Sequence, residues 1–421
     1  MTPDKYNGSM LRSSASHKRI LIWNAAGSAV YAASSFLMLL IVVRLCGDVE
    51  AGIFSMGYAI AQLMLTIGVF ESTTYFATDA ANRFSYEQYL AFKIITCVLM
   101  VIVSIVYVMS FGFDAHKAAV AYALCAFRLF EAVAQYWFGA FQKLERLDIG
   151  GFSSVWRSVI AMALFACVLF MNGDVVMATV VASISEAIWI AAYDVPRLRM
   201  LVKIGAPDFS PKIQGKILWA CLPMFIGSFL AAYLNNVSKY AINDVGTEQM
   251  QTIFNVLFMP AFVINLFLIF FMRPSLTTLA KHWLNREFAP FARIIVRLLV
   301  IAAIITAVVE GLCAVIGIPF LELFYGISLD GYLPALLVVM LGGGLLSASN
   351  VFYNGLVVIR AQHTVLIGYI IAIVIATLVA TPLVEAQGVM GACIAYSIAC
   401  AALFVTFALI FVVSALAKKK R

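Results

Sequence analysis

Long apolar stretches of membrane-spanning length occupy most of this 421-residue chain, and only short polar segments separate them. A helix that crosses a bilayer needs about 20 consecutive apolar residues, and the pattern contains about twelve stretches that meet this requirement. They lie at 20–45, 52–77, 88–112, 117–142, 153–171, 174–193, 217–242, 251–272, 290–317, 332–359, 363–383 and 388–416. The sequence therefore predicts an all-α integral membrane protein whose transmembrane helices number about twelve.

The most polar internal stretch, residues 194–216, falls almost midway along the chain. It predicts a cytoplasmic linker between two six-helix bundles, each of which begins and ends on the cytoplasmic side. The predicted organisation is a cytoplasmic N-terminal segment at 1–19, a six-helix bundle at 20–193, the linker at 194–216, a second six-helix bundle at 217–416 and a basic C-terminal tail at 417–421.

Lysine and arginine are distributed unevenly between alternate loops. One set of loops carries most of the basic residues, and both termini belong to it. The opposite set carries little more than Arg44, Lys117 and the border residue Lys239. Because cytoplasmic loops are enriched in Lys and Arg, both termini are predicted to lie in the cytoplasm. The formal net charge of +7 follows from this bias and needs no nucleic-acid partner.

Composition and motifs exclude several classes of protein. The chain is 64% hydrophobic and 12% charged, whereas soluble domains are about 45–50% apolar. The gaps between apolar stretches are too short for a folded domain of about 50 residues, and no G-x-x-x-x-G-K-[ST] motif for nucleotide binding occurs. The eight cysteines form no C-x-x-C pair and the four histidines are scattered, so no metal or cofactor is expected. The short outer loops do not favour a membrane-embedded enzyme.

A few charged residues nevertheless lie within predicted spans. A charge at the bilayer centre costs about 2.5–3.5 kcal/mol, so it usually faces a partner or a water-filled cavity. Arg128 and Glu131 are three residues apart in the fourth span and share a helix face. They are either a self-neutralising packing pair or a cavity-lining pair. Glu71 in the second span and Glu186 in the sixth are candidates for a coupling proton or cation, or for interhelical hydrogen bonds.

Other polar residues cluster near the ends of predicted spans. Asn235, Asn236 and Lys239 lie in the outer half of the seventh span and predict a wetted face there. A lysine near a helix end also reaches the interface without a cavity. Arg44, at the outer end of the first span, and Arg273, at the inner end of the eighth, can anchor the helices in the same way.

Short segments in both halves of the chain form a pattern of their own. They include Val43-Arg44-Leu45, Ala51-Gly52-Ile53-Phe54-Ser55, Phe70-Glu71, Tyr75-Phe76-Ala77-Thr78-Asp79, Ser238-Lys239-Tyr240-Ala241-Ile242, Phe258-Met259-Pro260-Ala261-Phe262 and Arg273-Pro274. These segments resemble the bacterial polysaccharide transporter (O-antigen flippase) family, and the likeness covers residues 20–145 and 217–281. This family belongs to the multidrug/oligosaccharidyl-lipid/polysaccharide (MOP) exporter superfamily.

The resemblance implies two six-helix bundles around a central cavity and a non-enzymatic function in the bacterial cytoplasmic membrane. The implied substrate is an undecaprenyl-pyrophosphate-linked oligosaccharide repeat, moved by alternating access, with polysaccharide assembly machinery as a possible partner. A coupling proton or cation would supply the energy. The alternative is a cation-coupled multidrug or small-solute transporter of the same superfamily.

The resemblance also assigns roles to the charged residues singled out above. A lipid-linked pyrophosphate is expected to meet basic residues, and arginine matches phosphate oxygens with its planar fork. The substrate-binding candidates are Arg44, Arg128, Lys239, Arg273, Asn235 and Asn236. The coupling-ion candidates are Glu71, Glu131 and Glu186.

Overall fold

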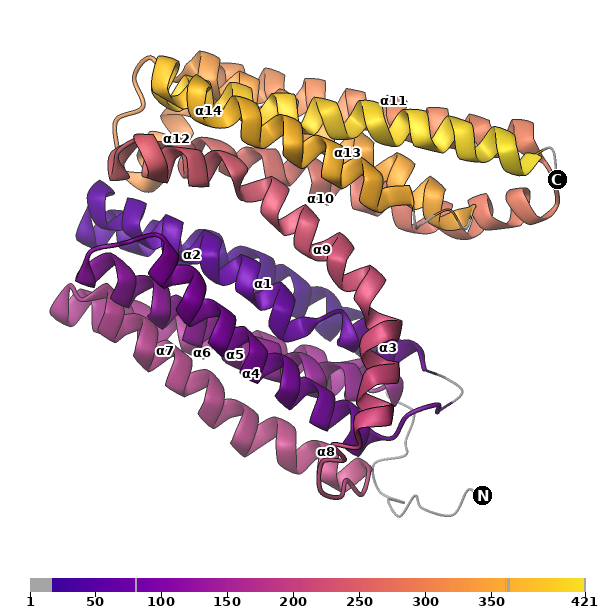
Figure 1. The fold of residues 1–421 in the computed structure, drawn as a ribbon. Coiled ribbons are helices and arrows are strands. Elements are labelled where there is room, and N and C mark those ends of the chain that lie inside the picture. Colours follow the sequence, from indigo (N-terminus) through magenta and orange to yellow (C-terminus); the bar gives the residue numbers. More distant parts are fainter. Residues whose placement is uncertain (1–16, 80–81, 360, 362–363, 420–421) are drawn as a thin grey trace. The chain divides into compact units, whose positions relative to one another are not determined.

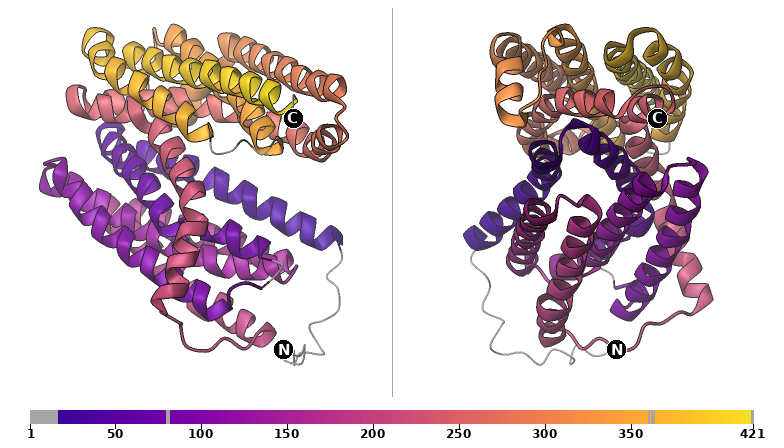
Figure 2. Two further views of the ribbon diagram at one scale, coloured as in Figure 1. Left: turned by 45° about the vertical axis from the view of Figure 1, so that its right-hand side comes forward. Right: turned by 90° about the vertical axis from the view of Figure 1, so that its left-hand side faces the viewer.

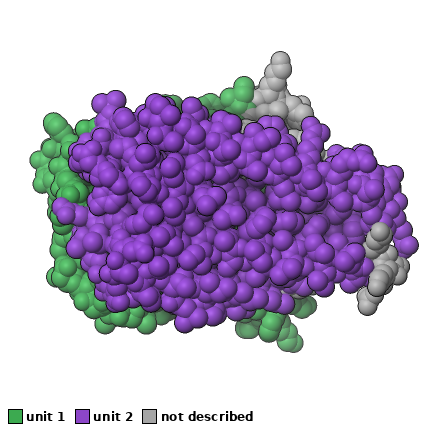
Figure 3. Space-filling view, turned by 90° about the horizontal axis from the view of Figure 1, so that it is seen from above, with its two compact units in different colours: residues 1–229 green, residues 230–421 purple. Residues whose placement is uncertain are grey.

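The computed structural model describes residues 17–79, 82–359, 361 and 364–419, except for the side chains of a few helical residues. All regular secondary structure in this described part is helical. Contacts divide the chain into two compact units, residues 1–229 and 230–421 (Figure 3). The predicted all-α membrane fold is therefore confirmed.

The first unit is a set of long helices that lie side by side (Figures 1 and 2). A π-helix, η1, joins α7 to α8, and α9 runs from the first unit across the division between Phe229 and Leu230. The elements are α1 (His17–Cys46), α2 (Asp48–Val69), α3 (Ser72–Thr78), α4 (Tyr86–Ser110), α5 (Ala115–Lys143), α6 (Leu147–Asn172), α7 (Val175–Trp189), η1 (Ile190–Asp194), α8 (Val195–Leu201) and α9 (Pro211–Val245).

The second unit contains the end of α9 and the helices that follow it. Within this unit α13 packs against α10, α11 and α14. The remaining elements are α10 (Glu248–Leu284), α11 (Phe288–Leu312), the π-helix η2 (Cys313–Gly317), α12 (Ile318–Tyr325), α13 (Leu333–Val358) and α14 (Val365–Lys419).

Ten helical segments among the described residues are long and apolar enough to cross a membrane. Two features explain why ten such segments are found where the sequence predicts about twelve. The long helix α14 covers the last two stretches and bends at Gly388, where φ is 58° and ψ is −129°. The helix α10 covers the eighth stretch but is not one of the ten. The number of twelve crossings and the side on which each terminus lies stay predictions.

Glycines allow the closest helix approaches in both units. In the first unit α1 packs against α6, and a Cβ on Gly151 would lie only 2.4 Å from the backbone of Trp23. In the second unit Gly342, Gly343 and Gly344 each face a different neighbouring helix, so α13 is enclosed by α14, α10 and α11. Small residues at such crossings permit the van der Waals contact that holds membrane helices together.

Residues 194–216, predicted as a linker, are partly helical. They contain the last residue of η1, all of α8 and the first turns of α9. The intervening chain is held against the first unit, because Gly205 N–H donates to Glu87 Oε1 at 2.9 Å and Gln88 Nε2 donates to Asp208 Oδ2 at 3.0 Å. This segment is therefore part of the packed first unit.

Candidate functional site

Four ionisable side chains from three helices of the first unit meet inside its membrane-spanning part. Arg128 and Glu131 lie on α5, Arg157 on α6 and Glu186 on α7. The Arg128 guanidinium forms an ion pair with the Glu131 carboxylate one turn further along the helix. Arg157 Nε lies 3.7 Å from Glu186 Oε1. We call these four residues the charge cluster.

The charge cluster is deeply buried, and its formal charges cancel. Arg128, Glu131 and Glu186 are each 3% exposed, and Arg157 is 6% exposed. Isolated buried charges are strongly unfavourable, so opposite charges are expected to be brought together in this way. The Arg128 guanidinium also lies 4.5 Å from the ring centroid of Tyr58, an arrangement that favours the cation.

Every member of the charge cluster keeps one polar atom without a hydrogen-bond partner among the described residues. These atoms are Arg128 Nε, Glu131 Oε1, Arg157 Nε and Glu186 Oε2. Each unsatisfied buried atom costs about 1–3 kcal/mol. A cavity of about 10 Å³ beside Tyr31 has room for about one water molecule. The cluster thus has unused capacity to bind water, a proton or a polar ligand.

Sequence reasoning identified three of the four members of the charge cluster. The contact between Arg128 and Glu131 follows from their spacing on one helix, and Glu186 was singled out as a charge inside a span. Arg157 was missed, although it too is a charge inside a predicted span, at 153–171. Its pairing with Glu186 depends on how α6 and α7 are rotated toward each other, which the sequence pattern alone does not give.

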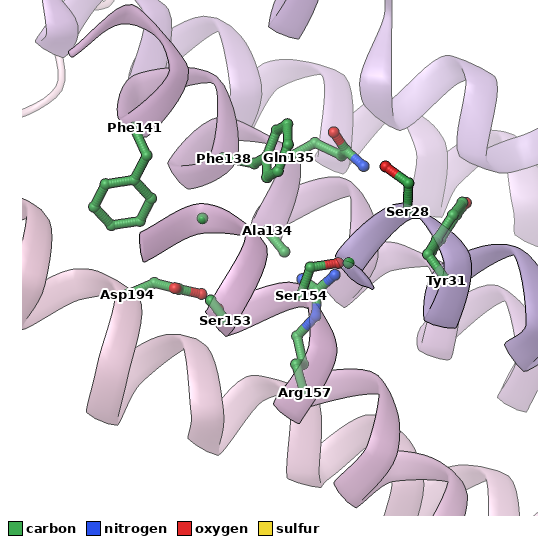
Figure 4. A pocket seen from close by; sticks show the side chains of 12 residues that line it. Ser28, Tyr31, Ala134, Gln135, Phe138, Phe141, Ser153, Ser154, Arg157 and Asp194 are labelled. Carbon is green, nitrogen blue, oxygen red and sulfur yellow. The ribbon is translucent and has the colours of Figure 1, made fainter. Parts of the chain in front are cut away.

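A larger cavity lies within the first unit, and Figure 4 shows the side chains that line it. Its volume is about 180 Å³. Tyr31 and Arg157 line this cavity and also the small cavity of the charge cluster, so the two sites adjoin. We call the larger one the polar cavity. It is lined by Gly27, Ser28, Tyr31, Ala134, Gln135, Phe138, Phe141, Gly150, Ser153, Ser154, Arg157 and Asp194.

Asp194 forms one side of the polar cavity and is positioned by the π-helix η1. Such segments inside α-helices are frequent at functional sites. Asp194 is 2% exposed, and its Oδ1 has no hydrogen-bond partner among the described residues. Its carboxylate points toward Ser153 in Figure 4, and the Ser153 hydroxyl accepts a hydrogen bond from Trp189 Nε1 at 3.0 Å. Sequence reasoning missed Asp194, because nothing in its neighbours predicts a π-helix.

Glu71 lies at a break in the second predicted span, away from the charge cluster. The helix α2 ends at Val69, and Phe70 and Glu71 have left-handed conformations with φ of 48° and 51°. Lys93 of α4 donates hydrogen bonds from Nζ to the carbonyls of Gly68 at 2.9 Å and Val69 at 3.2 Å. The lysine thus satisfies carbonyls at the end of α2 and interacts favourably with the negative end of its dipole.

The side chain of Glu71 is half-buried and accepts a hydrogen bond from Thr74 Oγ1 at 3.1 Å. Sequence reasoning missed Lys93, although it is a charged residue within the predicted span at 88–112. The break itself could not be predicted, because non-glycine residues rarely adopt left-handed conformations.

The polar residues predicted on the seventh span belong to the second unit. Lys239 Nζ lies 5.7 Å from the ring centroid of Phe258. Asn236 is buried and donates to the carbonyl of Ala232 at 2.9 Å, while Asn235 and Lys239 are half-buried. Lys239 and Asn235 are therefore the better exposed members of this polar stretch.

Arg44 and Arg273 are the two basic residues predicted at the ends of spans, and the structure describes the side chain of Arg44 only. Arg44 is exposed in the last turn of α1, where a positive charge is favourable because of the helix dipole. Arg273 lies in α10, but its side chain falls outside the described residues.

Asp79 follows α3, and its carboxylate binds backbone and side-chain groups that precede or belong to α4. Its carboxylate accepts hydrogen bonds from the backbone N–H groups of Arg83 and Phe84 and from the Tyr89 hydroxyl, and it lies 3.9 Å from Lys143 Nζ. Burial favours the neutral carboxyl, but these hydrogen bonds and the lysine outweigh it and lower the pKa of Asp79. These interactions indicate that Asp79 stabilises the fold.

No group of three or more His, Cys, Asp and Glu residues within the described chain is placed to hold a metal ion. The side chains that line the polar cavity can donate and accept hydrogen bonds.

No protein-family model and no curated protein sequence matches the chain significantly. Solved structures do match it. An inward-facing multidrug resistance MATE family transporter of the MOP superfamily superposes with a TM-score of 0.72 at 16% identity, over 92% of this chain and 95% of the other. Lipid II flippase MurJ in an inward closed conformation gives a TM-score of 0.65 at 13% identity, over 93% and 90%.

A third similar structure is a MOP superfamily transporter from Pyrococcus furiosus Vc1, described as having a binding pocket of reverse polarity. It matches with a TM-score of 0.55 at 15% identity and covers 96% of both chains. At these identities the likeness concerns the fold. The chain has the all-α fold shared by these MOP superfamily structures.

Proposed function

We propose that the protein moves an undecaprenyl-pyrophosphate-linked oligosaccharide repeat across the bacterial cytoplasmic membrane by alternating access, for surface polysaccharide synthesis. The observation that carries this proposal is the buried charge cluster beside a polar cavity, inside a fold whose solved examples include a lipid flippase. The resemblance of its sequence segments to polysaccharide transporters supports the substrate class.

The charge cluster is proposed to couple substrate binding to protonation. Arg128 is suited to phosphate oxygens, but Glu131 occupies its guanidinium in this structure. Protonation of Glu131 would release Arg128 for a phosphate, and phosphate binding would in turn favour that protonation. Glu186 stands in the same relation to Arg157.

The remaining candidates take supporting roles in this proposal. Lys239, with Asn235, offers a polar surface in the second unit, and the buried Asn236 stabilises α9 beside it. Arg44 and Arg273 would attract the anionic headgroup. Glu71 is kept as a second coupling site because its helix break provides unwound backbone at membrane depth.

The second candidate function is cation-coupled multidrug export, which the fold likeness to a MATE transporter favours. The two candidates require different cavities. A site for cationic drugs is expected to be acidic, whereas the charge cluster balances two carboxylates with two arginines. The reverse-polarity pocket described for another protein of this fold suggests that pocket polarity varies within it.

Replacing Arg128 and Lys239 together by alanine tests the proposal in cells that depend on this transporter. Export of surface polysaccharide is expected to be lost even after it is normalised to the protein abundance in the membrane, which is followed by immunoblot. A matched control replaces Arg293 and Arg297, two exposed basic residues of α11, and should retain export. Normal export in the Arg128 and Lys239 variant would contradict the assignment. Cationic-dye resistance without any effect on polysaccharide would favour multidrug export.

A further inference from the structure

The polar cavity offers a combination of groups that the proposed coupling role of the charge cluster does not use. Arg128, Glu131 and Glu186 do not line it. Hydroxyl and amide groups of Ser28, Gln135 and Ser154 extend toward its interior in Figure 4, where the aromatic ring of Phe138 also lies. Alternating donors, acceptors and aromatic surface are typical of small-ligand sites.

The two charged residues of the polar cavity limit which ligands it can take. Arg157 and Asp194 are both more than nine-tenths buried, and each has an atom without a hydrogen-bond partner among the described residues. An anion would be attracted by Arg157 but repelled by Asp194. A cation would be attracted by Asp194 but repelled by Arg157. A neutral molecule with several hydroxyl groups satisfies both, because each hydroxyl both donates and accepts.

The size of the polar cavity narrows the ligand further. Drug-sized ligands occupy pockets of about 300–1,000 Å³, whereas this cavity measures about 180 Å³. A space of this size is suited to one sugar ring, with an apolar face against Phe138 and hydroxyls toward Arg157 and Asp194.

We propose that the polar cavity binds one monosaccharide unit of the transported oligosaccharide. This inference rests on the proposed function and deepens it, because it assigns the sugar to the polar cavity and not to the small cavity of the charge cluster. Gln135 and Asp194 are then specificity-determining residues. The cluster responds to the charged part of the substrate, and Arg157 joins the two sites because it lines both cavities.

The test compares two kinds of lipid on the purified full-length protein in nanodiscs. The first is undecaprenyl pyrophosphate without sugar, and the second is the same lipid carrying one hexose, one N-acetylhexosamine or one 6-deoxyhexose. At least one sugar-bearing lipid is expected to bind about tenfold more tightly than the bare lipid, because its hydroxyls form hydrogen bonds with charged groups of the cavity.

Two substitutions in the polar cavity test whether the sugar binds there. Gln135→Leu keeps the approximate size of the side chain and Asp194→Asn keeps its shape, and each should reduce the ratio of the two affinities toward one. The control Gln142→Leu makes the same change on an exposed part of α5 and should preserve the ratio. Circular dichroism and gel filtration verify that each variant is folded.

The outcomes separate the sugar site from the proposed function. Binding of the bare lipid with no gain from any sugar would overturn the sugar site and leave the lipid-flippase proposal standing. A gain that Gln135→Leu and Asp194→Asn both retain would place the sugar elsewhere and also overturn this inference. Binding of neither kind of lipid would overturn the proposed function, and the sugar site with it.

Discussion

The two units of the chain differ in the kind of polar side chain that they bury. In the first unit four buried charges from three helices meet and keep unsatisfied atoms. Among the described residues of the second unit the buried polar side chains are uncharged: Asn236 and Ser238 donate to backbone carbonyls, whereas Gln251 and Ser347 keep atoms without a hydrogen-bond partner. The glycines of α13 bring helices of this unit into close contact. The contrast teaches that a charged residue within a span indicates function when the fold leaves it bonding capacity. A polar residue whose bonds are already made indicates packing.

Arg157→Leu is expected to have the largest effect on stability. It leaves the Glu186 carboxylate buried without its partner, and breaking a buried pair costs about 3–5 kcal/mol. The free energy of unfolding in mixed micelles measures this. The double variant Arg157→Leu, Glu186→Leu should recover most of the loss, because no charge remains unpaired. Lys239→Met in the second unit should cost less, since it leaves no carboxylate of the charge cluster behind. Equal losses of unfolding free energy in Arg157→Leu and Lys239→Met would contradict the difference between the two units.

Gly343→Ala tests the packing of the second unit. A Cβ at this position would lie 2.7 Å from the Cβ of Ala261 and 3.1 Å from its Cα, and overpacking of this kind costs about 1–3 kcal/mol. Gly311→Ala, on α11, is the matched control because no atom lies within 4 Å of its added Cβ. That control should be neutral or slightly stabilising. Thermal unfolding in detergent distinguishes them, and an equal response would refute close packing at Gly343.

Thr96→Val should destabilise the first unit by about 1 kcal/mol, the contribution of one neutral hydrogen bond. The Thr96 hydroxyl donates to the Gly68 carbonyl at 2.9 Å, beside the break at Phe70 and Glu71. Hydrogen exchange at residues of the break should increase as well. Ser110→Ala on the exposed end of α4 is the control and should leave exchange there unchanged. Unchanged exchange in Thr96→Val would show that this bond does not support the break.

Asp79→Asn should destabilise the first unit by an amount that depends on pH. The folded state lowers the pKa of Asp79 from its unfolded value of about 3.9. Its stabilisation is therefore present above that value and is lost as the pH falls through the lower folded pKa. The unfolding temperatures of wild type and variant are expected to differ near neutrality and to converge below pH about 4. A difference that persists in strong acid would contradict the ionic contribution.

Much of the architecture could be predicted because membrane helices are encoded locally. Apolar stretches gave the all-α fold, and the spacing of Arg128 and Glu131 gave their contact. Features that depend on neighbouring helices could not be obtained in this way. The pairing of Arg157 with Glu186 depends on the rotation of two helices, and the position of Asp194 in the polar cavity depends on the π-helix η1. The break at Glu71 needs Lys93 and Thr96 from another helix to satisfy its carbonyls.

Transport by the charge cluster is tested most directly with purified protein in liposomes that contain an undecaprenyl-pyrophosphate-linked oligosaccharide with a labelled sugar. A membrane-impermeant quencher reports how fast the label changes leaflets, with and without an imposed pH gradient. Wild type is expected to accelerate this movement over protein-free liposomes and to respond to the gradient. Glu131→Gln should remain folded but lose the response to the gradient. No acceleration by wild type, or an unaltered gradient response in Glu131→Gln, would contradict the account.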